Sequence, residues 1–288
     1  VLHLSNLSRL IPSNFYGNRV SLKPKELFKP WQGQYQKYTS LTNEYLKKYH
    51  TSLEYKYEVI LDLKKFFPSV NPEFLCQYIL ESLPVVLTEA DRRLYTIIIK
   101  KLLYCKVANL DPKHPELWEK YYYDDTANEK TERKEWDIFD NFTKGIPQGL
   151  PQSSFFGNIA MIPIAEKFDA KFPGTSLFYV DDSVIFTNEL DENAFEKNLK
   201  ELNHNINEMV SEVLKRKKSI LQNPIPELHK LYEIKVHVRD KSHYTRLDQI
   251  DKGEVFLMCL SREASHAATD FFHLYSEEED NSYKERMQ

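Results

Sequence analysis

The chain has 288 residues, of which 41% are hydrophobic and 13% aromatic, which excludes an intrinsically disordered protein and allows a large apolar core. Its 39 Lys and Arg residues against 43 Asp and Glu residues give a formal net charge of −4. This balance excludes a strongly basic nucleic-acid-binding protein, although it is compatible with a local basic groove.

The N-terminal part of the chain carries one clear strand signal. Residues 1–56 are polar, aromatic and basic without a clear periodicity, and they are interpreted as a fingers or N-terminal region. The run YEVILDLKKFF (57–67) predicts a buried strand over 58–63, because a short apolar run bounded by a proline is typical of one. Asp62 lies near the end of this strand.

Two helices are predicted after this strand. Asn71 is a favourable N-cap and Pro72 a favourable first helical residue. Thr88, with Asp91 three residues later, predicts the start of a second helix. This second helix and the charged residues after it are interpreted as a fingers segment inserted at about 85–143.

A loop, a helix and a hairpin are predicted next. KGIPQGLPQSS (144–154) has the composition of a turn-rich loop, and an apolar helix is expected over 153–170. TSLFYVDDSVIFTN (175–188) predicts a β-hairpin with Asp181 and Asp182 at its tip, because two apolar runs flank the two acids.

The pattern weakens toward the C-terminus. Asp191 is expected to cap a long amphipathic helix that ends in KRKKS (215–219), where cations suit the negative end of the helix dipole. LYEIKVHV (231–238) and EVFLMCL (254–260) are interpreted as strands or buried segments, and 262–276 as helical. Residues 224–288 are therefore expected to form a partly helical, thumb-like or C-terminal segment.

The paired aspartates at 181–182 indicate a metal site. Two carboxylates held close together are costly unless a cation neutralises them, and hard divalent ions such as Mg²⁺ prefer oxygen ligands. Asp62, another acid in an apolar strand, is the expected third ligand. A second Tyr-Asp-Asp sequence in YYYDDT (121–126) is followed by polar residues and is interpreted as a solvated loop.

Three segments resemble, in the same order, the palm motifs A, B and C of reverse transcriptases. They are ILDLKKFFPSV (60–70), GIPQGLPQSSFFGNIAM (145–161) and FYVDDSVIF (178–186). The resemblance implies an α/β (α+β) fold: a right-hand polymerase palm built on an antiparallel sheet, with fingers. The palm is expected over 57–223, and a partly helical segment is expected to follow it.

Within this family, FFPSV and PQGLPQSSFFGNIAM look most like the prokaryotic abortive-infection and related defence enzymes. The resemblance implies that Asp62 and Asp181 bind the metal, with Asp182 as a neighbouring carboxylate. Lys218, or Lys217 beside it, lies near the position of a family lysine that can donate a proton to pyrophosphate.

The resemblance also implies a nucleotide-binding group. Phe67, five residues after Asp62, corresponds to the aromatic residue that excludes a ribose 2′-hydroxyl, and Phe66 is placed in the same group. The other expected members are Gln148 and Gly149 in the motif B loop, Tyr179 near the primer terminus, and Arg19 near the triphosphate.

The predicted function is therefore DNA synthesis from dNTPs that depends on Mg²⁺ or Mn²⁺, in bacterial anti-phage defence, template-independent and primed by a protein side chain. The expected partners are dNTPs, an RNA template or DNA product, and a second copy or a partner protein. Three alternatives stay open: a templated retron- or group II intron-type enzyme, a catalytically silent palm acting as an assembly subunit, and RNA synthesis, which Phe67 disfavours.

No apolar run approaches the ~20 residues of a membrane span, and no secretory signal is visible. The three cysteines show no CxxC spacing, so neither a structural zinc site nor a disulfide framework is expected. These features predict a cytoplasmic protein that does not bind a membrane.

Overall fold

The structure is a computed structural model. It describes residues 7–21, 23, 28–83, 87–103, 145–146, 150–216, 236–239, 241–265 and 267. Among these residues, no helix is both long and apolar enough to cross a membrane.

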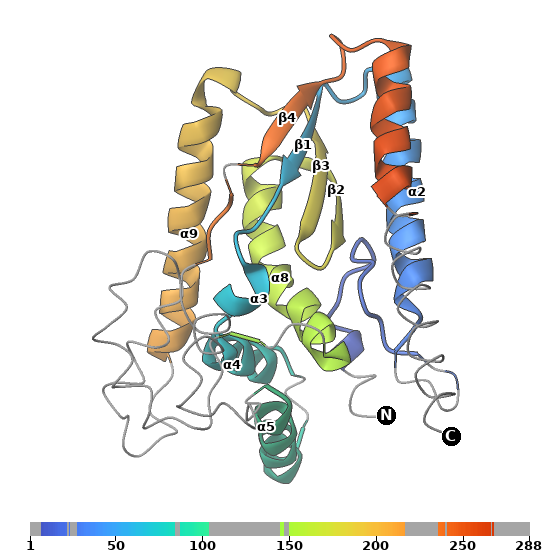
Figure 1. Cartoon of the computed structure of the whole chain (residues 1–288). Coiled ribbons are helices and arrows are strands. Elements are labelled where there is room, and N and C mark those ends of the chain that lie inside the picture. The colour runs from blue at the N-terminus through green and yellow to red at the C-terminus, as the bar shows by residue number, and fades with distance from the viewer. Residues whose placement is uncertain are drawn as a thin grey trace, which may run out of the picture.

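The described elements form a mixed helical and antiparallel-sheet fold, as expected (Figure 1). In chain order they are α2 (Trp31–Ser52), β1 (Tyr57–Leu61), α3 (Phe66–Ser69), α4 (Pro72–Ser82), α5 (Glu89–Leu103), α8 (Pro151–Lys171), β2 (Gly174–Tyr179), β3 (Asp182–Thr187), η1 (Glu192–Ala194), α9 (Phe195–Arg216) and β4 (His243–Arg246). Residues 252–265 are also helical. The four strands form one antiparallel sheet in the order β2-β3-β1-β4.

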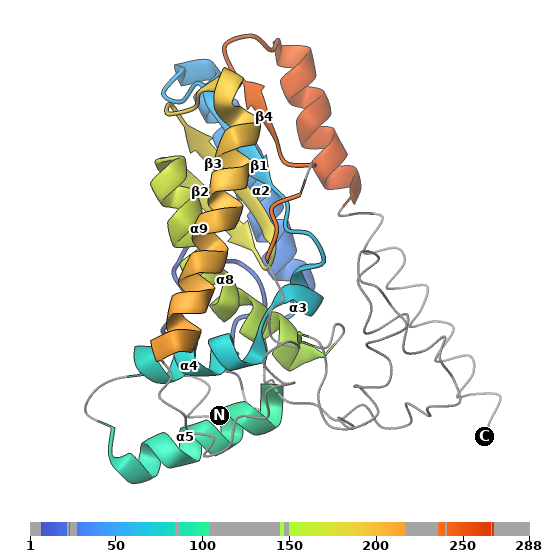
Figure 2. The ribbon, with the colours of Figure 1, turned by 90° about the vertical axis from the view of Figure 1, so that its left-hand side faces the viewer.

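The sheet is covered by helices on both faces, because successive side chains of a strand point to opposite sides. Val59 and Leu61 of β1 are buried in the larger core, which includes α4, α8 and α9. Ile60 of β1 and Phe186 of β3 belong to the second core, with α2 and the helical residues 252–265. Figures 1 and 2 show these two helical layers on either side of the strands.

The predicted helix starts are confirmed. The Asn71 side chain accepts hydrogen bonds from the amides of Glu73 and Phe74, at 2.9 and 3.0 Å, and Pro72 is the first residue of α4. Thr88 Oγ1 accepts from the Asp91 amide and Asp91 Oδ2 accepts from the Thr88 amide, at 3.1 and 3.2 Å. This reciprocal pair caps the start of α5.

Two long helices, besides the short α3, were not recognised in the sequence. The buried positions of α2 include Thr39, Thr42 and Asn43, so this helix lacks the aliphatic stripe that indicates an amphipathic helix. Residues 254–260, interpreted as a strand or buried segment, are helical, with Val255 buried and Phe256 62% exposed. Because apolar residues lie on both faces of this helix, its sequence does not show the hydrophobic period of an amphipathic helix.

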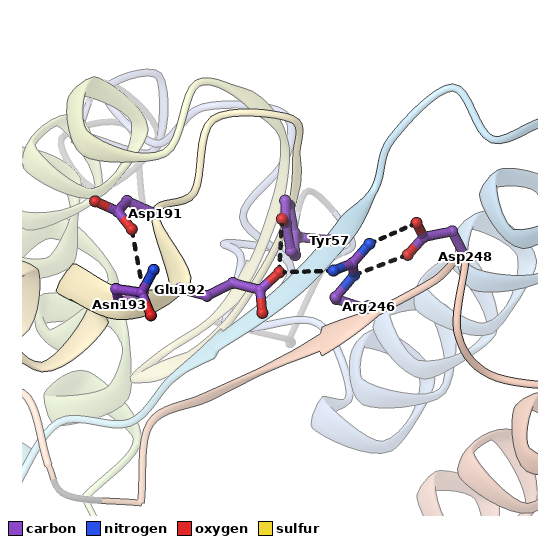
Figure 3. A network of polar contacts seen from close by, with 6 residues as sticks. All are labelled: Tyr57, Asp191, Glu192, Asn193, Arg246 and Asp248. Carbon is purple, nitrogen blue, oxygen red and sulfur yellow. Dashed lines mark hydrogen bonds and ion pairs between the residues drawn. The ribbon is translucent and has the colours of Figure 1, made fainter.

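β4 was also missed, because HYTR (243–246) contains no apolar run. It is held beside β1 by a polar network at the end of the sheet (Figure 3). The Arg246 guanidinium pairs with Glu192 at 3.2 Å and with both carboxylate oxygens of Asp248 at 3.0 and 2.8 Å. Tyr57 Oη donates to Glu192 at 2.9 Å, so β1, β4 and the turn before α9 are joined. β4 thus belongs to the same sheet as β1 and β3 although it lies beyond 223 in the chain.

Candidate catalytic site

The hairpin expected at 175–188 is present, and its tip has an unusual backbone. Tyr179 at the end of β2 pairs with Asp182 at the start of β3, so Val180 and Asp181 form the turn. Val180 has a φ of 55°, a left-handed conformation that a β-branched residue rarely adopts. Such a conformation persists only where the surrounding structure imposes it.

Two glycines enclose the Val180 side chain. A Cβ atom on Gly17 would lie 2.8 Å from Val180 Cγ2, and one on Gly157 would lie 3.3 Å from Val180 Cγ1. Gly157 comes from α8, whereas Gly17 follows a segment that pairs in parallel with β2 through Phe15 and Phe178. Val180 is buried between these two segments, which hold the turn in its strained form.

Asp62 lies beside this turn because of the sheet register. Leu61 pairs with Ser183, so the next residue, Asp62, lies where β3 begins at Asp182. The Asp62 amide donates to Ser242 Oγ at 3.1 Å, and its carbonyl accepts from the Arg239 amide at 2.6 Å. Asp62 Oδ2 lies 3.4 Å from Arg239 Nη1, which forms an ion pair with it.

The charge of Asp62 acts on the two aspartates of the turn. The pKa of Asp182 is raised to about 7, first because the surrounding protein desolvates it and then because of the charges of Asp181 and Asp62. Asp182 is nevertheless open to water at the cleft, which screens part of this effect. The pKa of Asp181 is raised by desolvation and by Asp62, against a hydrogen bond from its own amide and the charge of Arg239.

This set of acids fits a hard divalent cation by its chemistry. Within the parts of the chain that the structure describes, no three His, Cys, Asp or Glu side chains are grouped tightly enough to enclose a metal ion. Even so, the three carboxylates offer the oxygen ligands that Mg²⁺ and Mn²⁺ prefer. A cation among them would favour the ionised carboxylates and so oppose the desolvation and the neighbouring negative charge that raise the pKa values of Asp181 and Asp182.

A cleft of about 510 Å³ opens in front of the turn. Its lining residues are Asn18, Phe28, Lys29, Pro30, Trp31, Phe67, Leu150, Ser154, Tyr179, Val180, Asp181 and Asp182. Phe67 and Tyr179, both expected at a nucleotide site, therefore face the same space as Asp181 and Asp182. Asp62 pairs with Arg239 outside this lining.

Two of the residues expected to bind nucleotide lie elsewhere. Phe66 is 2% exposed and packs in the core with its ring 5.6 Å from that of Phe67. The Arg19 guanidinium donates to the carbonyls of Ile11 and Phe15, at 2.9 and 2.7 Å, and to that of Pro12. The two side chains thus pack in the core and against the N-terminal segment, and their nucleotide-binding roles stay predictions.

Sequence reasoning missed several lining residues, among them Lys29 and Trp31, which lie where the chain enters α2. The run FKPW (28–31) combines a cation with aromatic rings, which is a common combination for contact with nucleotides. Gln148, Gly149 and Lys218 lie outside the described residues, so their predicted roles stay predictions.

A comparison with protein families supports the arrangement described above. A family model described as "Reverse transcriptase (RNA-dependent DNA polymerase)" matches residues 16–228, well over half of the chain. This range includes the acids of the turn, Asp62 and the residues that line the cleft. A search of curated proteins found no match. The chain therefore belongs to the reverse transcriptase family of RNA-dependent DNA polymerases, which are nucleotidyltransferases that bind nucleic acid and dNTPs.

Proposed function

We propose that this protein extends a hydroxyl primer with dNTPs at the cleft in front of the Val180–Asp181 turn, using divalent metal ions held by Asp62, Asp181 and Asp182. The observation that carries this proposal is the sheet register that brings Asp62 beside the turn at Asp181 and Asp182, two acids that line the cleft. Two divalent ions at such a site would activate the attacking hydroxyl and stabilise the leaving pyrophosphate.

The residues of the cleft have complementary roles in this proposal. Phe67 faces the sugar of the incoming nucleotide and excludes a 2′-hydroxyl by its bulk, while Tyr179 contacts the primer terminus beside the acids. Lys29, exposed at the cleft, attracts the triphosphate, because a flexible ammonium group acts on phosphate as a point charge. The raised pKa of Asp182 makes this site sensitive to pH when no metal is bound.

We further infer that the reaction serves bacterial anti-phage defence, without a template and with a protein side chain as primer. The support for this inference is the resemblance of FFPSV (66–70) and PQGLPQSSFFGNIAM (147–161) to the abortive-infection enzymes. A templated enzyme of the retron or group II intron type is the alternative, and a silent palm that serves as an assembly subunit is a further one.

The test is the incorporation of labelled dNTPs by the purified protein with Mg²⁺ or Mn²⁺, with and without an RNA template. Labelled rNTPs and an Asp181→Asn/Asp182→Asn variant are run in parallel. Template-independent product that is absent with the variant and migrates with the protein supports the full proposal. Product that requires a template favours the retron or intron type. No product from the wild type under any of these conditions would contradict the polymerase proposal and favour the silent palm.

A further inference from the structure

The segment 236–239 runs alongside the residues that follow β1. Val238 forms an antiparallel bridge with Leu63, and the Lys64 amide donates to the His237 carbonyl at 2.7 Å. The Arg239 amide donates to the Asp62 carbonyl at 2.6 Å, so the backbone of the proposed metal ligand is fastened at the same place. None of these contacts could be expected from the sequence, because more than 170 residues separate the two segments.

Two asparagines of α9 hold this segment in position. Asn207 accepts from the Val236 amide at 3.0 Å and donates to the Val236 carbonyl at 2.8 Å. Asn203 accepts from the Val238 amide at 2.5 Å. A segment whose backbone is anchored at several points has a fixed course, so the position from which the Arg239 side chain extends is also fixed.

The Arg239 side chain reaches the acidic cluster from this position. Its Nη1 atom lies 3.4 Å from Asp62 Oδ2, and each side chain is 33% exposed. Arg239 also acts on Asp181, since it opposes the rise in the pKa of that carboxyl. A contact of 3.4 Å between partly exposed groups is a charge pair rather than a strong bidentate hydrogen bond, so it can be broken at modest cost.

We propose that Arg239 is a positioning residue that acts as an exchangeable counter-cation: it holds Asp62 while the site contains no metal and releases it when a divalent ion binds. This inference rests on the proposed function of Asp62 as a metal ligand. A guanidinium and a divalent ion repel each other and compete for the same carboxylate oxygens. Arg239 thus lowers the metal affinity of the free enzyme, while its backbone contact keeps Asp62 in position for the metal.

The test is a titration of the full chain with Mn²⁺, without nucleotide, followed through the electron paramagnetic resonance signal of the free ion. Arg239→Gln should bind Mn²⁺ about three- to tenfold more tightly than the wild type, because one competing charge is removed. Arg239→Lys, which keeps the charge, should return the affinity to near the wild-type value. Melting temperatures confirm that each variant is folded.

Lys64→Gln is the matched control. Lys64 is exposed, lies two residues from Asp62 and also loses one positive charge, yet its charge is not among those that shift the pKa of Asp181. We expect less than about a twofold change in its Mn²⁺ affinity. Equal or weaker Mn²⁺ binding by Arg239→Gln would overturn the proposal, as would an equal gain in Lys64→Gln.

The Asp181→Asn/Asp182→Asn variant separates this inference from the proposed function. If Mn²⁺ binding depends on these acids but not on Arg239, the role of Arg239 is wrong and the metal site stands. If Mn²⁺ binding does not depend on Asp181 and Asp182, the metal site itself is wrong and both proposals fall.

Discussion

Arg262 Nη2 lies 2.6 Å from Glu58 Oε2, so an ion pair joins the helical residues 252–265 to the middle of β1. Glu58 is fully buried, whereas the Arg262 side chain is 18% exposed, and Glu58 lies in β1, the strand that leads to Asp62. Burial raises the pKa of Tyr38 in the second core; the charges of Asp182 and Glu58 add to this rise, and that of Arg262 opposes it. The C-terminal helical residues are thus joined to the strand that leads to Asp62.

Removal of one partner of this ion pair should destabilise the protein. Arg262→Met leaves the Glu58 carboxylate buried without a counter-charge, and we expect a loss of about 3–5 kcal/mol in the free energy of unfolding. The double variant Glu58→Leu/Arg262→Met should recover most of this loss. Glu58 Oε1 and Arg262 Nη1 have no hydrogen-bond partner among the described residues, so the pair itself is imperfectly satisfied.

The loss should also depend on pH. Burial raises the pKa of Glu58 above 4.5, and Arg262 opposes that rise, so the variant binds the Glu58 proton more tightly than the wild type. The cost of the unpaired carboxylate is therefore small at low pH and grows as Glu58 ionises. Urea denaturation at about pH 5 and about pH 8 measures this difference, and an equal loss at both values would contradict it.

Asp182→Asn should stabilise the metal-free protein, and more so at higher pH. The folded-state pKa of Asp182 is raised from 3.8 to about 7, so the folded protein disfavours the ionised form. The resulting penalty is absent below 3.8, develops as pH rises through this interval and is complete above about 7. The variant, which cannot ionise at this position, does not incur the penalty.

Melting temperatures in EDTA at about pH 5 and about pH 8 test this expectation. The gain of the variant over the wild type should be larger at the higher pH. Added Mg²⁺ should stabilise the wild type at the higher pH and have less effect on the variant. A gain that is the same at both pH values would show that Asp182 is not the group that titrates.

Gly17→Ala should disturb the acidic turn. The new Cβ atom would lie 2.8 Å from both Asn158 Oδ1 and Val180 Cγ2, two side chains that are buried and cannot move freely. We expect a loss of about 1–3 kcal/mol in the free energy of unfolding and a lower rate of dNTP incorporation.

Gly33→Ala in α2 is the control for this substitution. No atom lies within 4 Å of a Cβ built on Gly33, and the residue is exposed in a helix. Alanine is a better helix former than glycine, so this variant should be more stable by about 0.5–1 kcal/mol and keep its incorporation rate. Chemical denaturation of the two variants measures both changes in the free energy of unfolding. If Gly17→Ala were as stable as Gly33→Ala, the close approach of Gly17 to Val180 would not contribute to stability.

Lys29→Gln should weaken nucleotide binding. If Lys29 attracts the triphosphate across the cleft, the KM for dNTP should rise about three- to tenfold with little change in kcat. Lys171→Gln provides the comparison, because Lys171 is the last residue of α8 whereas the cleft adjoins the start of that helix. Steady-state incorporation kinetics measure the KM of both variants. An equal rise in KM for Lys29→Gln and Lys171→Gln would exclude a specific role for Lys29.

Part of the candidate site could be predicted from the sequence because its signal comes from residues that are neighbours along the chain. Asp181 and Asp182 lie between two apolar runs whose strands pair through a tight turn, so neighbouring residues carry the whole signal. The caps at Asn71 and Thr88 are similarly local, since each bonds to amides within three residues. These features appear in the structure where the sequence predicted them.

Other features, such as the helix α2 and the contacts of Arg19, could not be predicted because the neighbouring sequence shows no pattern that indicates them. α2 buries threonine and asparagine: Thr42 donates to the Tyr38 carbonyl of the same helix, and Asn43 donates to the Cys259 carbonyl and to Glu263, at 3.3 and 3.1 Å. The contacts of Asn43 join positions more than 200 residues apart. The hydrogen bonds of Arg19 were similarly not foreseeable, because the carbonyls around its guanidinium depend on how the chain folds over residues 11–15.

The sequence by itself determined the antiparallel hairpin, the identity of the three acids and the family of the chain, because strand periodicity, turn chemistry and motif order are short-range properties. Only the tertiary structure decided which cations pair with Asp62 and Glu58 and which one lines the cleft. Arg239 reaches Asp62, Arg262 reaches Glu58 and Lys29 reaches the cleft through separate elements. The reason is physical: the partner of a charge is set by the register and packing of strands and helices that are distant in sequence, and no local pattern encodes it.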